Sequence, residues 1–150
     1  MTVPGQGSAK SDLNNCRVLL AEDDPDHGPL LSLILAKAGA QVTVAKNGAE
    51  AVEMAEEAYD DKRPFDIILM DMQMPVLDGY GATQKIKQTD SETPILAVTA
   101  RAFDKERNKC FEVGCDDFIA KPVETDKLIS SVATQLKKTS ADFTGHQPKC

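Results

Sequence analysis

Short apolar runs alternate with longer amphipathic segments along most of this chain, and this alternation limits its fold more than any other feature. Three of the runs are almost continuously apolar, which is typical of strands covered by helices on both faces. The segments between them repeat apolar residues at helical spacing, as in the stripe of Leu30, Leu31, Ile34 and Leu35. The runs lie at 17–21, 41–45, 65–70, 94–98 and 117–120. Five strands alternating with five helices predict an α/β protein with a doubly wound (βα)5 parallel sheet.

The start of the first helix has two interpretations. If Asp24 caps the helix, Pro29 lies inside it and removes an internal hydrogen bond. A start at Gly28 or Pro29, with Asp26 or His27 near the cap, avoids this conflict. The sequence does not decide between the two starts.

Length and composition favour one domain with a packed core. The chain has 150 residues, 41% of them hydrophobic, which excludes wholesale disorder. We expect the domain over residues 15–138. The segment 1–14 is rich in small and polar residues and is expected to be flexible, and 139–150 is expected to be a disordered tail.

The charge balance and the apolar runs exclude several classes of partner. With 24 Asp and Glu against 17 Lys and Arg, the net charge is -7, so we expect no nucleic-acid partner. No run is long enough to span a bilayer, and the start MTVPGQGSAK lacks the apolar core of a secretory signal. The four cysteines lack CxxC spacing, so we expect free thiols in a reducing cytoplasm rather than a zinc site or a disulfide framework.

Polar side chains follow four of the five apolar runs. Glu22 and Asp23 follow the first run, Asp71 the third, Thr99 the fourth and Lys121 the fifth. The carboxyl ends of parallel strands form one edge, where open α/β sheets bind their ligands. A turn or a helix cap explains one acid at such a position, but not polar residues at four strand ends. The sequence therefore predicts a site that combines carboxylates, a hydroxyl and an ammonium.

The charges of this set favour a divalent cation. Crowded carboxylates raise one another's pKa unless a cation lies between them. Lys121 offsets one of the three carboxylates, so a divalent ion would neutralise the remaining two. Oxygen ligands favour Mg²⁺, or Mn²⁺, over zinc. A carboxylate beside such an ion is a nucleophile toward phosphorus, which makes Asp71 a candidate for an aspartyl phosphate.

Four stretches of this sequence together resemble the receiver domain of two-component response regulators. They are VLLAEDDPD, DIILMDMQMPVLDGYGA, PILAVTA and GCDDFIAKPV, and the resemblance runs from about Cys16 to Leu136. The combination of MDMQMP with DGYGAT looks most like the receivers of hybrid sensor histidine kinases. The resemblance implies a flavodoxin-like sheet with strand order 2-1-3-4-5.

The resemblance also implies the chemistry of the site. Asp71 would accept a phosphoryl group from a phosphohistidine on a histidine kinase or a histidine phosphotransfer domain. Asp23 and Asp71 would bind Mg²⁺ directly, Glu22 would bind it through water, and the main-chain carbonyl of Gln73 would be a further ligand. Such a domain catalyses its own phosphorylation and dephosphorylation but is not a stand-alone enzyme.

Further residues would respond to the phosphate. Thr99 looks like the switch hydroxyl, Lys121 like the phosphate-binding lysine, and the Lys121–Pro122 bond is expected to be cis. Phe118 matches the switch aromatic, although a plain core phenylalanine is an equal interpretation. The expected result is a change in the surface formed by the helix around Phe111, the strand at 117–120 and the last helix.

Two positions near the site have two interpretations each. Gln73 and Arg101, each two residues beyond a predicted site residue, would tune dephosphorylation by flanking the incoming water, or would be solvated loop residues. Phosphatases of the haloacid-dehalogenase type need an acid two residues after the nucleophile. Gln73 occupies that position here, so this class of enzyme is disfavoured. Flavodoxin-like flavin binding is disfavoured because the acidic residues 22–26 would repel the flavin phosphate.

Other features stay open at this level. A receiver-like module that binds partners without taking phosphate is a third alternative. The sequence leaves open both a stand-alone regulator and a receiver from a hybrid kinase, and both a monomer and a homodimer.

Overall fold

Five parallel strands alternate with five helices in the computed structural model, which describes residues 13–74, 76–100 and 103–142. The sheet order is β2-β1-β3-β4-β5, so the predicted (βα)5 fold and its strand order are confirmed. The strands are β1 (Arg17–Ala21), β2 (Gln41–Ala45), β3 (Ile67–Asp71), β4 (Ile95–Thr99) and β5 (Asp117–Ala120). The helices are α2 (His27–Lys37), α3 (Gly48–Asp60), α4 (Gly79–Thr89), α5 (Asp104–Val113) and α6 (Thr125–Asp142).

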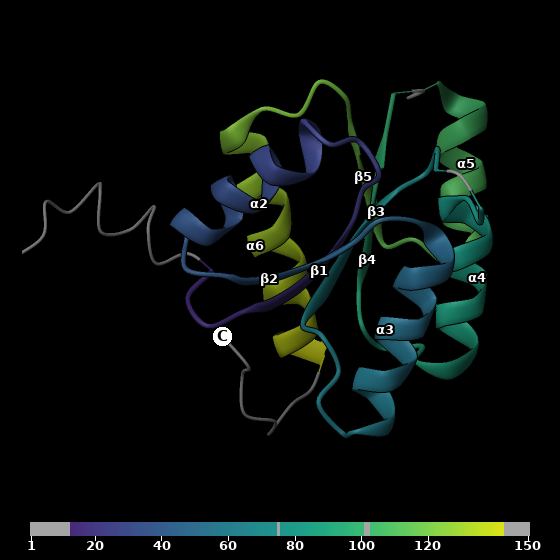
Figure 1. Ribbon diagram of the computed structural model, residues 1–150, viewed down its shortest axis with the longest axis horizontal. Coiled ribbons are helices and arrows are strands. Elements are labelled where there is room, and N and C mark those ends of the chain that lie inside the picture. Colours follow the sequence, from purple (N-terminus) through teal and green to yellow (C-terminus); the bar gives the residue numbers. More distant parts are fainter. Residues whose placement is uncertain (1–12, 75, 101–102, 143–150) are drawn as a thin grey trace, which may run out of the picture.

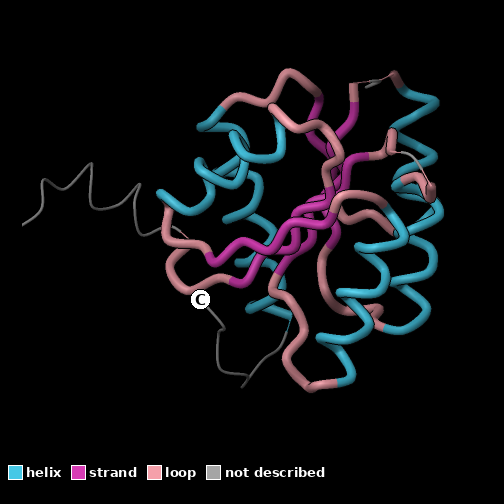
Figure 2. Tube along the Cα trace, in the orientation of Figure 1, coloured by secondary structure: helices cyan, strands magenta, loops and turns pink. Residues whose placement is uncertain are grey.

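The sheet lies between two helical layers. Figure 1 shows α2 and α6 on one face and α3, α4 and α5 on the other, and Figure 2 shows the strands between them. Each face has its own core, with Leu35 and Val132 in the first and Ala55 and Ile86 in the second. The inner strands β3 and β4 are buried along their whole length, as the continuous apolar runs predict, whereas the edge strand β2 is mostly exposed.

The first helix begins at His27, close to the later of the two predicted starts. Its N-cap, Asp26, makes no side-chain capping bond. Instead, Oδ1 of Asp24 accepts hydrogen bonds from the backbone amides of Asp26 and His27, at 2.8 and 3.2 Å. This start places Pro29 in the first turn, where its missing N–H removes no internal hydrogen bond.

Some expectations about the helices and domain limits differ from the structure. Leu30 is 50% exposed, because α2 turns Leu31 and Leu35 toward the sheet and leaves Leu30 on its outer face. Leu13, within the segment expected to be flexible, is fully buried and donates its amide to the Ala38 carbonyl. Helix α6 continues to Asp142, beyond the expected limit at 138.

The cysteines follow the expectation only in part. Cys110 and Cys115 are buried free thiols, as expected. Cys16 is also buried but is disulfide-bonded, so the prediction of free thiols is wrong for this residue. Among the described helices, none is both long enough and apolar enough to cross a membrane.

Candidate functional site

The acidic cluster forms where β1 and β3 end side by side. Parallel pairing places Ala21 opposite Met70, so Glu22 and Asp23 emerge beside Asp71, the last residue of β3. One carboxylate oxygen from each of the three acids lies within 4.8 Å of the other two. Glu22 and Asp71 are buried, whereas Asp23 is exposed. The cluster is therefore open to solvent on the side of Asp23.

Lys121 joins this cluster from the end of β5. Its Nζ lies 3.2 Å from Oδ2 of Asp71 and 3.3 Å from Oε1 of Glu22. Burial alone would lower the pKa of Lys121, but the two carboxylates outweigh it and raise that pKa above its usual value. The ammonium therefore stays charged between the two acids.

Among the acids that the structure describes, Glu22 has the most strongly shifted pKa. Burial, and then the neighbouring Asp71 carboxylate, raise the pKa of Glu22 to about 7 against the opposing effect of Lys121. His27 lies on the other side, with Nδ1 3.6 Å from Oε1 of Glu22. The contact between His27 and Glu22 was not predicted, because the sequence indicates only that His27 lies near the start of a helix.

Gln73 connects Asp71 to Thr99. Its backbone N–H donates to Oδ1 of Asp71 at 3.0 Å, and its side-chain Nε2 donates to Oγ1 of Thr99 at 3.4 Å. Thr99, the last residue of β4, is buried, while Gln73 is exposed. The two oxygens of Asp71 thus face different donors, the Gln73 amide and the Lys121 ammonium.

The donor set suits a hard divalent cation. Three carboxylates from two strand ends converge, one of them exposed, and burial together with the neighbouring Asp71 carboxylate raises the pKa of Glu22. Mg²⁺ prefers oxygen ligands and keeps several waters, so a shallow site with few carboxylates fits it. The structure therefore brings together Glu22, Asp23, Asp71, Thr99 and Lys121 as the strand ends predict.

The remaining predicted residues lie around this centre or outside the described part. The Lys121–Pro122 bond is cis, as expected. Phe118 is half-buried on β5, and its ring meets Phe111 of α5 edge-on, with centroids 6.4 Å apart. Arg101 lies outside the described residues.

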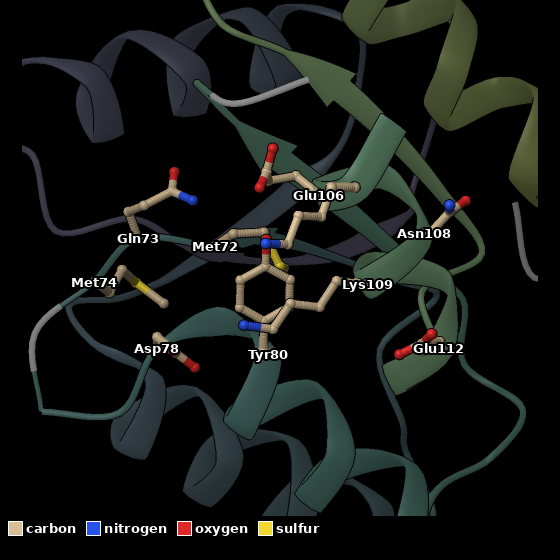
Figure 3. A pocket seen from close by; sticks show the side chains of 10 residues that line it. Met72, Gln73, Met74, Asp78, Tyr80, Glu106, Asn108, Lys109 and Glu112 are labelled. Carbon is tan, nitrogen blue, oxygen red and sulfur yellow. The ribbon is translucent and has the colours of Figure 1, made fainter. Parts of the chain in front are cut away.

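A cleft next to the acidic cluster was not predicted. It has a volume of about 880 Å³ and lies between the loop after β3 and the helix α5 (Figure 3). Gln73 is at its edge, and Lys109 of α5 lies over the ring of Tyr80 of α4, 4.2 Å from its centroid. Helix rotation sets this juxtaposition, so no local sequence signal indicates it. The lining residues are Met72, Gln73, Met74, Asp78, Tyr80, Lys105, Glu106, Asn108, Lys109 and Glu112.

Comparison with known proteins gives one consistent result. Residues 18–133 match the family described as the response regulator receiver domain. The chain is 36% identical over 126 residues to hybrid signal transduction histidine kinase I of Dictyostelium discoideum, a match that covers 81% of this chain and 7% of the relative. It is 35% identical over 126 residues to the sensor histidine kinase RcsC of Escherichia coli K12, covering 84% of this chain and 13% of the relative. The chain thus corresponds to a small part of these relatives.

Solved structures agree with the sequence relatives. The receiver domain of a sensor histidine kinase from Pseudomonas aeruginosa PAO1 is 34% identical and superposes with a TM-score of 0.73, covering 81% of this chain and 97% of that one. That structure holds a magnesium ion coordinated in its active-site cleft. A CheY-like receiver domain from Methanospirillum hungatei, at 22% identity and a TM-score of 0.78, covers 86% of this chain and 99% of that one and supports the fold.

Proposed function

The chain belongs to the response regulator receiver domains of two-component signalling, and on that premise we propose that Asp71 is its phosphoacceptor. The observation that carries the proposal is the position of Asp71, buried at a strand end between an ammonium and two further carboxylates. The donor would be a phosphohistidine of a histidine kinase or of a histidine phosphotransfer domain. The sequence relatives that are themselves histidine kinases support this choice of partner.

Side chains of the cluster would hold Mg²⁺, or Mn²⁺, during transfer. Asp23 and Asp71 would be direct ligands, Glu22 would act through water, and the carbonyl of Gln73 would complete the protein ligands. The bound ion supplies charge neutralisation at the transferring group. The magnesium ion in the Pseudomonas receiver and the oxygen-only cluster here support the assignment.

The transfer itself needs one nucleophile and no redox partner. An Asp71 carboxylate oxygen forms a bond to phosphorus, the phosphorus–nitrogen bond to the donor imidazole breaks, and its electron pair returns to the nitrogen. Lys121, already within 3.2 Å of Asp71, would pair with a phosphoryl oxygen. The protein thus catalyses its own phosphorylation without turning over a free substrate.

The phosphate would act by favouring one of two conformations. Thr99 would leave Gln73 and donate its hydroxyl hydrogen to a phosphoryl oxygen, and Phe118 would turn inward. The surface formed by α5, β5 and α6 would then change. Gln73 and Arg101 would tune the rate at which water removes the phosphate.

The setting of this domain is part of the proposal. We place it in the cytoplasm, at residues 15–138, as one module of a phosphorelay, either in a hybrid histidine kinase or as a separate regulator. We expect neither a nucleic-acid nor a membrane partner for this domain. It would act as a monomer or a homodimer.

Labelling with acetyl phosphate in the presence of Mg²⁺ tests the phosphoacceptor. Wild-type protein should gain one phosphoryl group by intact-protein mass spectrometry, and Asp71→Asn should gain none. The matched control is Asp60→Asn, which changes an aspartate at the C-terminal end of α3 and should label like wild type. Labelling of Asp71→Asn to the wild-type extent would contradict the assignment.

A further inference from the structure

The ring of Phe118 contacts two side chains of α5. The guanidinium of Arg107 lies over one face, with Cζ 5.1 Å from the ring centroid. Phe111 meets the ring edge-on at an interplanar angle of 87°. Both contacts have geometries that attract, since a ring face carries negative charge density and ring edges carry positive.

Helix α5 presents these two residues as part of one stripe. The N-cap residue Phe103, Arg107 and Phe111 are spaced four residues apart, which places them along one side of α5. Phe103 and Phe111 are 74% and 44% exposed, so the stripe borders solvent. Phe118 itself is half-buried rather than part of the fully enclosed core.

Among the described residues, Arg107 has one competing ionic contact, and it is weak. Its Nη1 lies 4.0 Å from Oδ1 of Asp104, at the outer limit for an ion pair, and the Asp104 side chain is almost fully exposed. An exposed pair at this spacing contributes little. The ring of Phe118 is therefore the stronger interaction of this guanidinium among those the structure describes.

We propose that Arg107 is a positioning residue that, with Phe111, holds Phe118 in its half-buried position and so opposes the phosphorylated conformation. The inference rests on the proposed function, because it assumes that Phe118 turns inward when Asp71 is phosphorylated. Turning inward would separate the ring from Arg107. A contact made in only one of two conformations shifts their equilibrium by its own free energy.

The expected size of the effect follows from the exposure of the contact. A cation–π pair at an exposed site changes an equilibrium by about two- to fivefold. When most molecules are in the resting conformation, a ligand that binds only the other conformation must first shift this equilibrium. Loss of the contact therefore increases the apparent affinity for such a ligand by about the same two- to fivefold factor. Arg107 would thus set how much phosphate binding is needed to switch the protein.

Fluoroberyllate with Mg²⁺, a mimic of the phosphoryl group on aspartate, provides the test. Its affinity is measured for wild type, for Arg107→Met, which keeps the aliphatic stem, and for two controls on the same helix. Lys105→Met removes a positive charge that lines the cleft. Asp104→Asn removes the carboxylate of the weak ion pair. The Phe118 ring resonances are recorded by NMR for each protein without the mimic.

Arg107→Met should bind fluoroberyllate about two- to fivefold more tightly than wild type and should shift the Phe118 ring resonances. Both controls should keep the wild-type affinity and the wild-type resonances. Equal affinity of Arg107→Met and wild type would overturn the inference and leave the proposed function intact. Failure of wild type to bind fluoroberyllate at all would overturn the proposed function, and the inference with it.

Discussion

Lys121 places its ammonium nitrogen 3.2 Å from Oδ2 of Asp71, where β3 and β5 reach the same edge of the sheet. Both side chains are largely withdrawn from water, with 20% and 2% exposure. The same nitrogen lies 3.3 Å from Glu22, whose pKa of about 7 means that it is ionised at pH 8. At that pH the ammonium separates two buried negative charges.

Removal of this ammonium should therefore destabilise the protein when Mg²⁺ is absent. We expect Lys121→Met to lose about 1 to 3 kcal/mol of unfolding free energy at pH 8, less than for a fully buried pair because the lysine is partly exposed. Urea unfolding in a chelating buffer measures the loss. Lys127→Met removes an exposed lysine of α6 and should change stability by less than about 0.5 kcal/mol. Equal unfolding free energies of the two variants would show that Lys121 does not stabilise the buried carboxylates of Glu22 and Asp71.

Asp23 and Asp24 are neighbours with different expected effects on metal binding. Asp23 contributes an oxygen to the cluster with Glu22 and Asp71. Asp24 uses Oδ1 to accept the amides of Asp26 and His27, which hold its pKa below the usual value. Asp23→Asn should weaken Mg²⁺ binding at least about tenfold, whereas Asp24→Asn should leave it within about twofold.

Isothermal titration of each variant with Mg²⁺ measures this difference. Circular dichroism of both proteins checks that α2 is retained. A loss of affinity in Asp24→Asn as large as in Asp23→Asn would mean that the acidic loop acts as a general electrostatic attractor rather than as a set of ligands.

The convergence of Asp71, Glu22 and Lys121 could be predicted because it depends on topology alone. Each residue follows an apolar run, and parallel strands bring all their carboxyl ends to one edge. The continuous apolar runs likewise predict that β3 and β4 are strands covered on both faces. These features require only the alternation of strands and helices, which short sequence patterns indicate.

Contacts that depend on helix rotation or on turn geometry could not be predicted in this way. The position of Arg107 over Phe118 requires the angle at which α5 packs on the sheet, and the exposure of Leu30 depends likewise on the rotation of α2. The bond from Gln73 to Thr99 depends on the backbone of the loop after β3. The pKa of Glu22 reflects burial by several elements at once, which no single segment determines.

Glycine at position 48 is required by a close approach of two backbone segments. A Cβ at this position would overlap the Leu77 carbonyl oxygen and lie 2.8 Å from its carbon, both of them main-chain atoms. By contrast, the nearest atom to a Cβ on Gly28 is 3.7 Å away, which is ordinary contact. Gly48→Ala should lower the unfolding free energy by about 1 to 3 kcal/mol, as overpacking does. Gly28→Ala should raise it by as much as about 1 kcal/mol, as expected for glycine replaced in a helix.

Thermal or urea unfolding of both variants tests this contrast. The two changes add the same methyl group at the first turn of a helix, so only the local space differs. A Gly48→Ala protein as stable as Gly28→Ala would show that the Leu77 segment moves aside at no cost.

The thiol of Cys115 makes stability depend on alkaline pH. Burial, and then the neighbouring Cys110, raise the pKa of Cys115 to about 12 from an ordinary value of 9.0. Between these values the unfolded chain releases the thiol proton and the folded protein keeps it, so stability is present below pH 9 and falls as the pH rises toward 12. The slope for one such proton is at most about 1.4 kcal/mol per pH unit.

Cys115→Ser retains a small polar group that does not titrate in this range, and its unfolding free energy by urea denaturation should fall less steeply between pH 9 and 10.5. Tyr80, whose pKa is raised to about 12, remains in both proteins and cancels in the comparison. Parallel pH curves for the two proteins would show that the Cys115 thiol titrates alike in the folded and unfolded chain.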